Sequence, residues 1–477
     1  MNNATLFAIG AYFALMLGIG IYAWRKSTSD SSEYLLSGRS LGPAVTALAA
    51  GASDMSGWLM LGLPGAIYVS GLAESWIGIG LFFGAWANWV LVAPRLREQT
   101  ERLGALTIPE FLGNRFADQS HLLRIVASLV IVVFFAVYSA SGLVAGGKLF
   151  ESAFGLSYHT GLWVTASVVV AYVVLGGFLA VSLTDFVQGT IMMIALVALP
   201  LVALGNFNEG ASAVDVLRDI DPAMLSLFGG TSLLGVISAA AWGLGYFGQP
   251  HIIVRFMAIR SVKDIPTARF IGLAWMLISL IGAIAVGLVG RAWFTAHATP
   301  IDDPETVFIL LGQVLLHPLA LGFLLSAILA AIMSTISAQL LVTGSSLTED
   351  FYRLFVRRDA GEREIVTVGR LSVVAVAAVA MILAQDPNGS VLSLVSNAWA
   401  GFGAAFGPVI LLSLTWPKMT RNGALAGMVI GALVVIVWIQ AGLSAALYEL
   451  VPGFVAAMLA IVGVSVIAPD KKEMAHG

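Results

Sequence analysis

The sequence contains no cysteine and few charged residues. Without cysteine, disulfide bonds, thiolate catalysis and cysteine-based metal sites are excluded. Asp, Glu, Lys and Arg together make up 11% of the 477 residues, whereas a soluble domain usually carries about 25%. The net charge of -3 and the lack of a basic stripe also argue against a nucleic-acid partner. The chain is therefore not composed like a protein that folds in water.

Long apolar runs take the place of the missing charge. Hydrophobic residues make up 59% of the chain, and the mean hydropathy is +0.93. Each run is near the roughly 20 residues that a helix needs to cross the hydrocarbon core. No basic segment precedes the first run, which argues against a cleaved signal peptide. We therefore expect an all-α polytopic membrane protein.

The apolar runs predict about thirteen transmembrane helices. The second and ninth runs are longer than a perpendicular helix requires, so tilt, a break or an extension beyond the membrane is expected there. The expected spans are 5–24, 42–70, 73–94, 122–150, 159–180, 184–205, 231–256, 268–294, 306–346, 367–385, 390–416, 423–442 and 447–468.

Lys and Arg are distributed unevenly between the connections. When the connections are numbered alternately, one set holds 21 of the 24 basic residues, and the other holds only Lys148, Arg218 and Arg291. Because basic residues favour the cytoplasmic side, the N-terminus is predicted outside. The C-terminus, with Lys471 and Lys472, is predicted in the cytoplasm.

Residues 1–477 are expected to form a single membrane domain. The longest connections, near 95–121, 206–230 and 347–366, are too short for a soluble domain. The six histidines are scattered, and no paired motif for metal binding or catalysis appears. We therefore do not expect an enzyme, and the missing signalling domain argues against a membrane sensor or receptor.

The second span contains polar and flexible residues where an apolar helix is expected. Asp54 lies 13 residues after Leu41, or about 20 Å along a helix, and Gly51 and Gly57 flank it. Intramembrane carboxylates and broken helices are typical of ion and substrate sites in transporters. The alternative is a structural Asp that is paired with a neighbour or caps the half-helix after it.

The seventh span is interrupted in a similar way. Three glycines and Pro250 fall within eight residues and weaken any helix. Trp242 and Tyr246 are four residues apart, so they share a helix face and offer an apolar wall with polar tips. The alternative is an interfacial aromatic belt combined with a kink.

The two interrupted spans are five spans apart. Matching interruptions in two five-helix halves are the sequence pattern of an inverted-repeat transporter. We therefore expect a five-plus-five core, with residues 42–205 as the first repeat and 231–416 as the second. Residues 5–24 and 423–468 would form peripheral helices.

Two further sets of polar residues lie inside predicted spans. Ser334 and Thr335 are adjacent hydroxyls that can supply oxygen ligands to a cation such as Na⁺, although membrane Ser and Thr often bond back to their own helix. Asp185 is expected to begin the sixth span after a short turn. It is either a helix-start carboxylate or a group at the cytoplasmic exit of a cation.

These motifs carry a family resemblance. Across essentially its whole length the chain resembles the sodium/solute symporter family, at Gly38–Pro43, Gly51–Pro64, Trp242–His251, Leu325–Thr335 and Ser413–Leu433. The resemblance implies a leucine-transporter-type core with spans two and seven broken. It also implies a protein of the bacterial inner membrane that uses Na⁺ as its coupling ion and no organic cofactor.

The resemblance also implies roles for particular residues. Asp54 matches an essential carboxylate of the family, Asp185 a carboxylate near the sodium exit route, and Arg39 a position tied to coupling. The Na⁺ site would use backbone carbonyls of Ala52, Met55 and Ala331 with the hydroxyls of Ser334 and Thr335. The solute would be bound by Ser56, Gly57, Tyr138, Trp242, Tyr246 and Pro250.

The implied activity is Na⁺-coupled uptake of L-proline by alternating access. The partners would then be L-proline, Na⁺ and the lipid bilayer. A carrier of another small zwitterion such as a betaine is the alternative within the same class, and a membrane sensor or receptor is the alternative from another class. Linkage requires that Na⁺ and the solute raise each other's affinity by the same factor.

Overall fold

The computed structural model describes residues 2–26, 31–207, 212–387 and 390–469. Within these ranges the chain is helical and has no strand. The β pairing seen there is one isolated bridge, in which Leu41 lies parallel to Ile259. Lys471 and Lys472, on which part of the predicted orientation rests, lie outside the described ranges.

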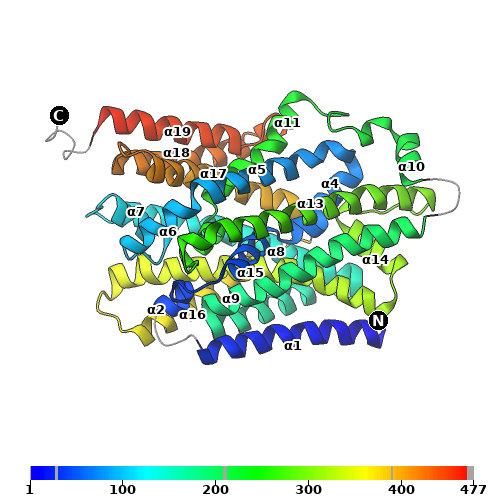
Figure 1. Ribbon diagram of the computed structural model, residues 1–477, viewed down its shortest axis with the longest axis horizontal. Helices are drawn as coiled ribbons and strands as arrows, with labels where there is room; N and C mark the ends of the chain where they lie inside the picture. Colours follow the sequence, from blue (N-terminus) through cyan, green and yellow to red (C-terminus); the bar gives the residue numbers. More distant parts are fainter. Residues whose placement is uncertain (1, 27–30, 208–211, 388–389, 470–477) are drawn as a thin grey trace.

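The helices form an elongated bundle in which most axes run along its length (Figure 1). The first helix, α1, begins at one end of the bundle, and the last helix, α19, finishes at the opposite end (Figure 1). The long helices are α1 (Asn3–Lys26), α5 (Ser75–Leu91), α8 (Leu122–Phe154), α9 (Tyr158–Gly205), α13 (Ile265–Ala296), α15 (Pro318–Ser346), α16 (Glu362–Leu383), α17 (Val391–Thr415), α18 (Arg421–Gln440) and α19 (Leu450–Ile467).

Ten helical stretches in the described chain are long and apolar enough to cross a membrane. This number does not test the predicted thirteen spans, because it counts bent helices once and omits spans that are divided into short pieces. The short α-helices are α2 (Ser31–Leu36), α3 (Pro43–Asp54), α4 (Leu63–Ser70), α6 (Ala93–Arg102), α7 (Ile108–Arg115), α10 (Ala213–Ile220), α11 (Leu233–Ala240), α12 (Pro250–Ala258) and α14 (Val307–Leu315).

Tighter or wider helical turns join several of these elements. They include the π-helical η2 and η8 and the 3₁₀-helical η5, which continue α-helices inside the bundle. Their bounds, with those of the remaining turns, are η1 (Ser37–Arg39), η2 (Trp58–Gly62), η3 (Gly71–Glu74), η4 (Pro222–Leu225), η5 (Ala241–Gly248), η6 (Val262–Asp264), η7 (Pro304–Thr306), η8 (Leu347–Val356) and η9 (Leu443–Ala445).

The predicted turn between the fifth and sixth spans is wrong in position. The structure has one continuous stretch, α9, which bends at Gly177 instead of at 181–183. Gly177 has φ 57° and ψ -148°, a backbone conformation that favours glycine because it has no Cβ. A Cβ at Gly177 would also approach the ring of Tyr34 to 2.5 Å. Asp185 consequently lies within a helix and does not begin one.

The predicted ninth span, 306–346, is also divided. Helix α14 finishes at Leu315, and α15 begins at Pro318. Proline fixes its own φ and has no N–H, so it is tolerated in the first turn of a helix and not in its interior. The long run is therefore two helices, and the second begins at the proline.

Helix α15 forms the centre of the bundle. Every side chain from Leu324 to Leu341 is buried, and the helix packs against α1, α8 and α9. A helix that is apolar on all sides is expected to be enclosed by others. Because α15 is enclosed, the few hydroxyl groups on it must find their partners inside the protein.

Glycines allow a close crossing between α5 and η5. A Cβ at Gly80 would lie 2.1 Å from the carbonyl oxygen of Ala240, and one at Gly84 would lie 2.2 Å from that of Gly243. Real Cβ atoms do not approach backbone so closely, so side chains at these positions would push the two segments apart. Small residues serve the same purpose at many membrane helix interfaces.

Candidate functional site

The site is built around the point where α3 stops. Helix α3 finishes at Asp54, and Met55 has φ -76° and ψ 74°, which is not helical. The Ser56 N–H donates to the carbonyl of Asp54 at 2.9 Å and not to that of Ala52. Helical backbone resumes before Trp58. The interruption releases the Ala52 carbonyl from the helical ladder, so that it can accept bonds from elsewhere.

Helix α15 supplies the groups that face this carbonyl. The Ser334 hydroxyl donates to the Ala52 carbonyl oxygen at 2.8 Å, and the Thr335 hydroxyl lies 3.5 Å from the same oxygen. Both hydroxyls also lie close to the Ala331 carbonyl, at 3.1 and 3.3 Å. Four of the five residues expected to hold Na⁺ therefore bring an oxygen to one place.

The oxygens at this place are neutral and hard. Carbonyl and hydroxyl oxygens suit cations such as Na⁺, and the described residues contain no group of three or more His, Cys, Asp or Glu that could hold a metal. Met55, the fifth expected residue, lies in the interruption and is fully buried. Bonds from Ser334 and Thr335 to their own helix are present as well, as the alternative interpretation of this pair predicts.

Asp54 connects the interruption of α3 to η5. Its side chain is 1% exposed, and Oδ2 accepts a hydrogen bond from the Tyr246 hydroxyl. Oδ1 has no hydrogen-bond partner. The indole N–H of Trp58 donates to the Asp54 carbonyl at 3.3 Å. A buried carboxylate with one free oxygen is costly unless a cation or a donor reaches it.

Aromatic rings surround the solute-binding positions expected on η5. The Trp242 ring lies 6.0 Å from that of Trp58, and the Tyr246 ring meets Trp399 edge-on at 5.3 Å. The Trp399 indole N–H donates to the Trp242 carbonyl at 2.8 Å, and the Asn88 amide donates to the Tyr246 carbonyl at 3.0 Å. Trp399 and Asn88 therefore hold the loosened turns of η5 in place.

Sequence reasoning missed Trp399 and Asn88. They lie on α17 and α5, far from η5 in the chain, and no local pattern distinguishes Trp399 from other residues of an apolar helix. A polar Asn in the middle of an apolar run was the available signal for Asn88, because buried amides need partners.

The remaining expected solute-binding residues lie on three elements. Tyr138, on α8, is 1% exposed, and its ring meets His251 edge-on at 5.8 Å. Gly57 lies against α8, since a Cβ there would approach the Ala145 side chain to 3.0 Å. Pro250 is the first residue of α12. Ser56 lies in the interruption, where its hydroxyl accepts from the Trp58 N–H at 3.4 Å.

Asp185 is paired with a basic residue that the sequence analysis did not connect to it. The Arg255 guanidinium lies 3.1 Å from Asp185 Oδ2, and both side chains are fully buried. Arg255 also donates to the His251 carbonyl at 2.7 Å and lies over the Phe178 ring. The pair joins α9 to α12 inside the bundle.

Arg39 fastens η1 to two neighbouring segments. Its guanidinium donates to the carbonyl oxygens of Ala105 at 2.6 Å, Met257 at 2.8 Å and Thr100 at 3.1 Å. It therefore bridges α6 and the connection after it to the last turns of α12. Arg39 thus holds α12 close to the segment that precedes α3.

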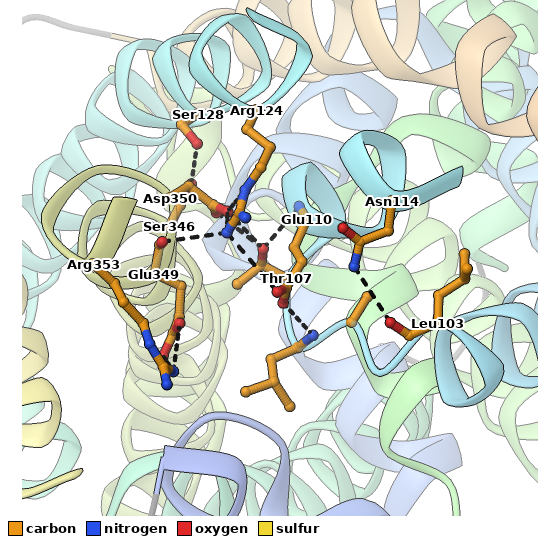
Figure 2. Close-up of polar contacts among 12 residues, drawn as sticks. Leu103, Thr107, Glu110, Asn114, Arg124, Ser128, Ser346, Glu349, Asp350 and Arg353 are labelled. Atoms are coloured by element: carbon orange, nitrogen blue, oxygen red, sulfur yellow. Dashed lines mark hydrogen bonds and ion pairs between the residues drawn. The ribbon is translucent and has the colours of Figure 1, made fainter. Parts of the chain in front are cut away.

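A further polar cluster lies at the start of α7. Asp350, in η8, accepts from Arg124 of α8 at 2.8 Å and from the Thr107 hydroxyl at 2.9 Å (Figure 2). Glu110 lies beside the same guanidinium at 3.9 Å. The cluster ties the continuation of α15 to α7 and α8, and the sequence analysis did not identify it.

The arrangement of two interrupted segments around a central helix is that of a secondary transporter. The chain matches the model of the Sodium:solute symporter family over residues 34–431, and it belongs to that family. The expectation of a sodium/solute symporter is thereby confirmed.

Curated relatives are similar along nearly the whole chain. The high-affinity proline transporter PutP of Bacillus subtilis is 58% identical over 453 residues, which cover 95% of this chain and 96% of the relative. The osmoregulated proline transporter OpuE of the same organism is 52% identical, covering 98% and 95%. Sodium/proline symporter 2 of Staphylococcus saprophyticus is 54% identical, covering 95% and 91%.

Solved structures show the same fold. A Na⁺-coupled sialic acid symporter in a substrate-bound outward-open state superposes with a TM-score of 0.84 at 17% identity, covering 98% of each chain. Mhp1, a nucleobase-cation-symport-1 family transporter, gives a TM-score of 0.58 at 14% identity, covering 92% of this chain and 95% of that one. The predicted all-helical, leucine-transporter-type fold is confirmed.

Proposed function

We propose that this protein takes up L-proline together with Na⁺ by alternating access. The observation that carries the proposal is the similarity to curated proline transporters, up to 58% identity over 95% of the chain. At that similarity, with both chains covered nearly completely, a change of solute class would need changes in the residues around the central site. The Trp242, Tyr246 and Tyr138 positions expected for an imino acid are all present and buried.

In this proposal Na⁺ binds between α3 and α15. The ligands are the carbonyl oxygens of Ala52, Met55 and Ala331 and the hydroxyls of Ser334 and Thr335. The approach of the Ser334 hydroxyl to the Ala52 carbonyl oxygen, at 2.8 Å, supports the assignment because the same oxygens need only open slightly to admit an ion. A cation at this point would hold the interrupted α3 against the central helix.

L-Proline binds beside the same interruption. Its carboxylate is received by N–H groups at the start of the helix that follows Gly57, where the helix dipole favours negative charge. Its apolar ring packs against Trp242 and Tyr246. Asp54, with its free oxygen, lies between the two ligands and attracts the positive ends of both.

Coupling between Na⁺ and proline follows because both bind at the interruption of α3. If Na⁺ fixes the backbone near Ala52, it also fixes the N–H groups that receive the carboxylate a few residues later. Each ligand then lowers the cost of ordering this segment for the other, which is positive linkage. Arg39 contacts α12, and Arg255 of α12 pairs with Asp185, so these three residues are proposed to relay the change toward the cytoplasmic end.

The proposal includes the predicted orientation of the protein in the membrane. The N-terminus is outside and the C-terminus in the cytoplasm, in a bacterial inner membrane. The beginning of α1 and the end of α19 lie at opposite ends of the bundle, which supports an odd number of crossings (Figure 1).

Transport into proteoliposomes tests the solute and the ion together. Uptake of radiolabelled L-proline is expected only with an inward Na⁺ gradient, and excess unlabelled L-proline should compete far better than glycine betaine. Uptake that persists after the Na⁺ gradient is collapsed would remove Na⁺ from the proposal. Stronger competition by betaine than by proline would make betaine the proposed solute and would keep Na⁺ as the proposed coupling ion.

A further inference from the structure

A small cavity lies beside Asp54, among residues of α3, α5, η5, α12 and α13. All of its lining residues except Gly51 and Leu273 are buried. The space open to the centre of a water-sized sphere is about 20 Å³. A single water molecule needs roughly 10–15 Å³ on that measure. The cavity therefore has room for one water molecule and is too small for an amino acid.

Two buried oxygen atoms of the cavity lining need a hydrogen-bond donor. Asp54 Oδ1 and Asn88 Oδ1 have no partner within the described chain, and each side chain is 1% exposed. The Asn88 amide nitrogen donates to the Tyr246 carbonyl oxygen at 3.0 Å. That carbonyl can only accept, so the orientation of the amide is fixed and Oδ1 faces elsewhere. An ionised carboxylate and an amide oxygen cannot satisfy each other, so a molecule that serves both must donate twice.

The other lining groups favour water over Na⁺. The indole nitrogen of Trp89 lies next to Gly272, since a Cβ there would approach it to 3.6 Å. Its N–H group can donate to a water oxygen and would repel a cation. The Tyr246 hydroxyl already donates to Asp54. Water, which both donates and accepts, matches this combination of groups, and ordered water commonly fills such places in protein interiors.

We propose that one water molecule binds in this cavity and donates to Asp54 Oδ1 and Asn88 Oδ1, so that Asn88 positions Asp54 through it. Asn88 then holds both interrupted segments, η5 directly at the Tyr246 carbonyl and α3 through the water. A donor at Oδ1 stabilises the ionised carboxylate, and this charge adjoins the proposed Na⁺ site. The effect on Na⁺ rests on the proposed function, whereas the water site does not.

Gly272→Ala fills the cavity without changing a polar group. A Cβ at Gly272 would lie 3.6 Å from the Trp89 indole nitrogen and 3.7 Å from the Ala47 side chain, which are ordinary van der Waals distances. Alanine also favours helical backbone over glycine, so α13 should fold normally. Gly369→Ala is the matched control, because Gly369 is buried on α16, has its nearest contacts at 3.5 Å and is not among the lining residues.

Hydroxyl-radical labelling with an X-ray pulse tests whether water is bound, because radicals formed from a bound water oxidise the side chains next to it. Met276 lines the cavity and is 4% exposed, and mass spectrometry of the purified protein measures its oxidation. We expect Met276 to be labelled in wild type and Gly369→Ala, and to lose most of its labelling in Gly272→Ala. Met333, which is fully buried on α15, reports the background.

Three results of the labelling experiment would overturn the proposal. Background labelling of Met276 in wild type would show a dry cavity, and equal labelling in wild type and Gly272→Ala would place the water elsewhere. Labelling that disappears when choline is replaced by Na⁺ would assign the cavity to the ion. Asn88→Leu keeps the size of the side chain and removes its oxygen, so it should also lose labelling, and full labelling would exclude Asn88 from the site.

Na⁺ activation of proline uptake in proteoliposomes tests the positioning role. Loss of one hydrogen bond predicts that Gly272→Ala raises the half-saturating Na⁺ concentration about tenfold, with a smaller change for proline at saturating Na⁺. Gly369→Ala should match wild type. Unchanged Na⁺ activation in Gly272→Ala that has lost Met276 labelling would refute the role of the water. Wild-type uptake that is independent of Na⁺ would refute the proposed function instead, and the labelling would still decide the water site.

Discussion

The Ser334 hydroxyl of α15 donates a hydrogen bond to the Ala52 carbonyl of α3 across 2.8 Å. These residues are 282 positions apart in the chain, and they meet because α3 stops two residues after Ala52 and leaves the carbonyl without a helical partner. The contact joins the two elements that we propose to hold Na⁺. In our proposal, ion coupling depends on this contact.

Removing either hydroxyl should weaken Na⁺ activation. Ser334→Ala and Thr335→Ala are each expected to raise the Na⁺ concentration for half-maximal uptake about tenfold, because one ligand is lost. Ser326, on the same helix, donates to the Gly322 carbonyl of its own helix, so Ser326→Ala is the matched control. Wild-type Na⁺ activation in both Ser334→Ala and Thr335→Ala would show that these hydroxyls do not bind the ion.

The negative charge of Asp54 is expected to be needed for Na⁺ activation of proline uptake. Asp54→Asn keeps an acceptor for Tyr246 and removes the negative charge, so it is expected to lose most Na⁺ activation of proline uptake. Tyr246→Phe removes the donor and should have a smaller effect on Na⁺. The double variant tests coupling between them, since neighbours in one hydrogen bond are non-additive. If Asp54→Asn kept normal Na⁺ activation, the carboxylate would be structural.

Trp242 should contribute more to the apparent affinity for proline than to that for Na⁺. Trp242→Ala removes an apolar wall, and we expect the half-saturating proline concentration to rise at least about tenfold, with a smaller change for Na⁺. Initial uptake rates in proteoliposomes give both values. Equal losses for proline and Na⁺ would point to misfolding, which a thermal unfolding measurement on the purified variant would reveal.

The buried pair of Asp185 and Arg255 should contribute to stability. Arg255→Ala leaves Asp185 buried without its cation, and removing one partner of a buried pair costs about 3–5 kcal/mol. Arg218 forms an exposed pair with Asp215 at 3.0 Å, and Arg218→Ala should change stability by less than about 1 kcal/mol. Unfolding of the purified proteins in detergent measures both. Equal stability of the two variants would contradict this role for the pair.

The close crossing of α5 and η5 should not tolerate a methyl group. Gly84→Ala would place a Cβ 2.2 Å from the Gly243 carbonyl oxygen, whereas a Cβ at Gly18 meets nothing within 4 Å. We expect Gly84→Ala to lower the melting temperature and proline uptake, and Gly18→Ala to leave both unchanged. Similar behaviour of the two variants would mean that the segments can separate without loss.

Much of the fold could be predicted from the sequence because the membrane imposes simple requirements. Apolar length located the helices, and the family motifs indicated the fold, which the solved structures confirm. The predicted turn at 181–183 failed because the bend depends on the positive φ of Gly177, which hydropathy does not register. Hydropathy predicts one span over 306–346 because the residues on both sides of Pro318 are apolar, whereas the proline starts a new helix.

The site could be predicted only where local chemistry was unusual. Asp54 could be predicted because a carboxylate is unusual in an apolar run. Ser334 and Thr335 could be predicted because they are adjacent hydroxyls inside an apolar span. Their roles as ligands stay predictions. Arg255 could not be assigned to Asp185, because the two are 70 positions apart and their contact depends on tertiary packing. The same holds for Trp399, whose bond to Trp242 spans 157 positions.

Reciprocal binding tests the central claim most directly. The dissociation constant of radiolabelled L-proline is measured on purified protein over a range of Na⁺ concentrations, for wild type and for Ser334→Ala. We predict that Na⁺ tightens proline binding to wild type, that proline tightens Na⁺ binding by the same factor, and that Ser334→Ala needs a higher Na⁺ concentration for the same effect. Proline binding to wild type that is equally tight with and without Na⁺ would contradict the account.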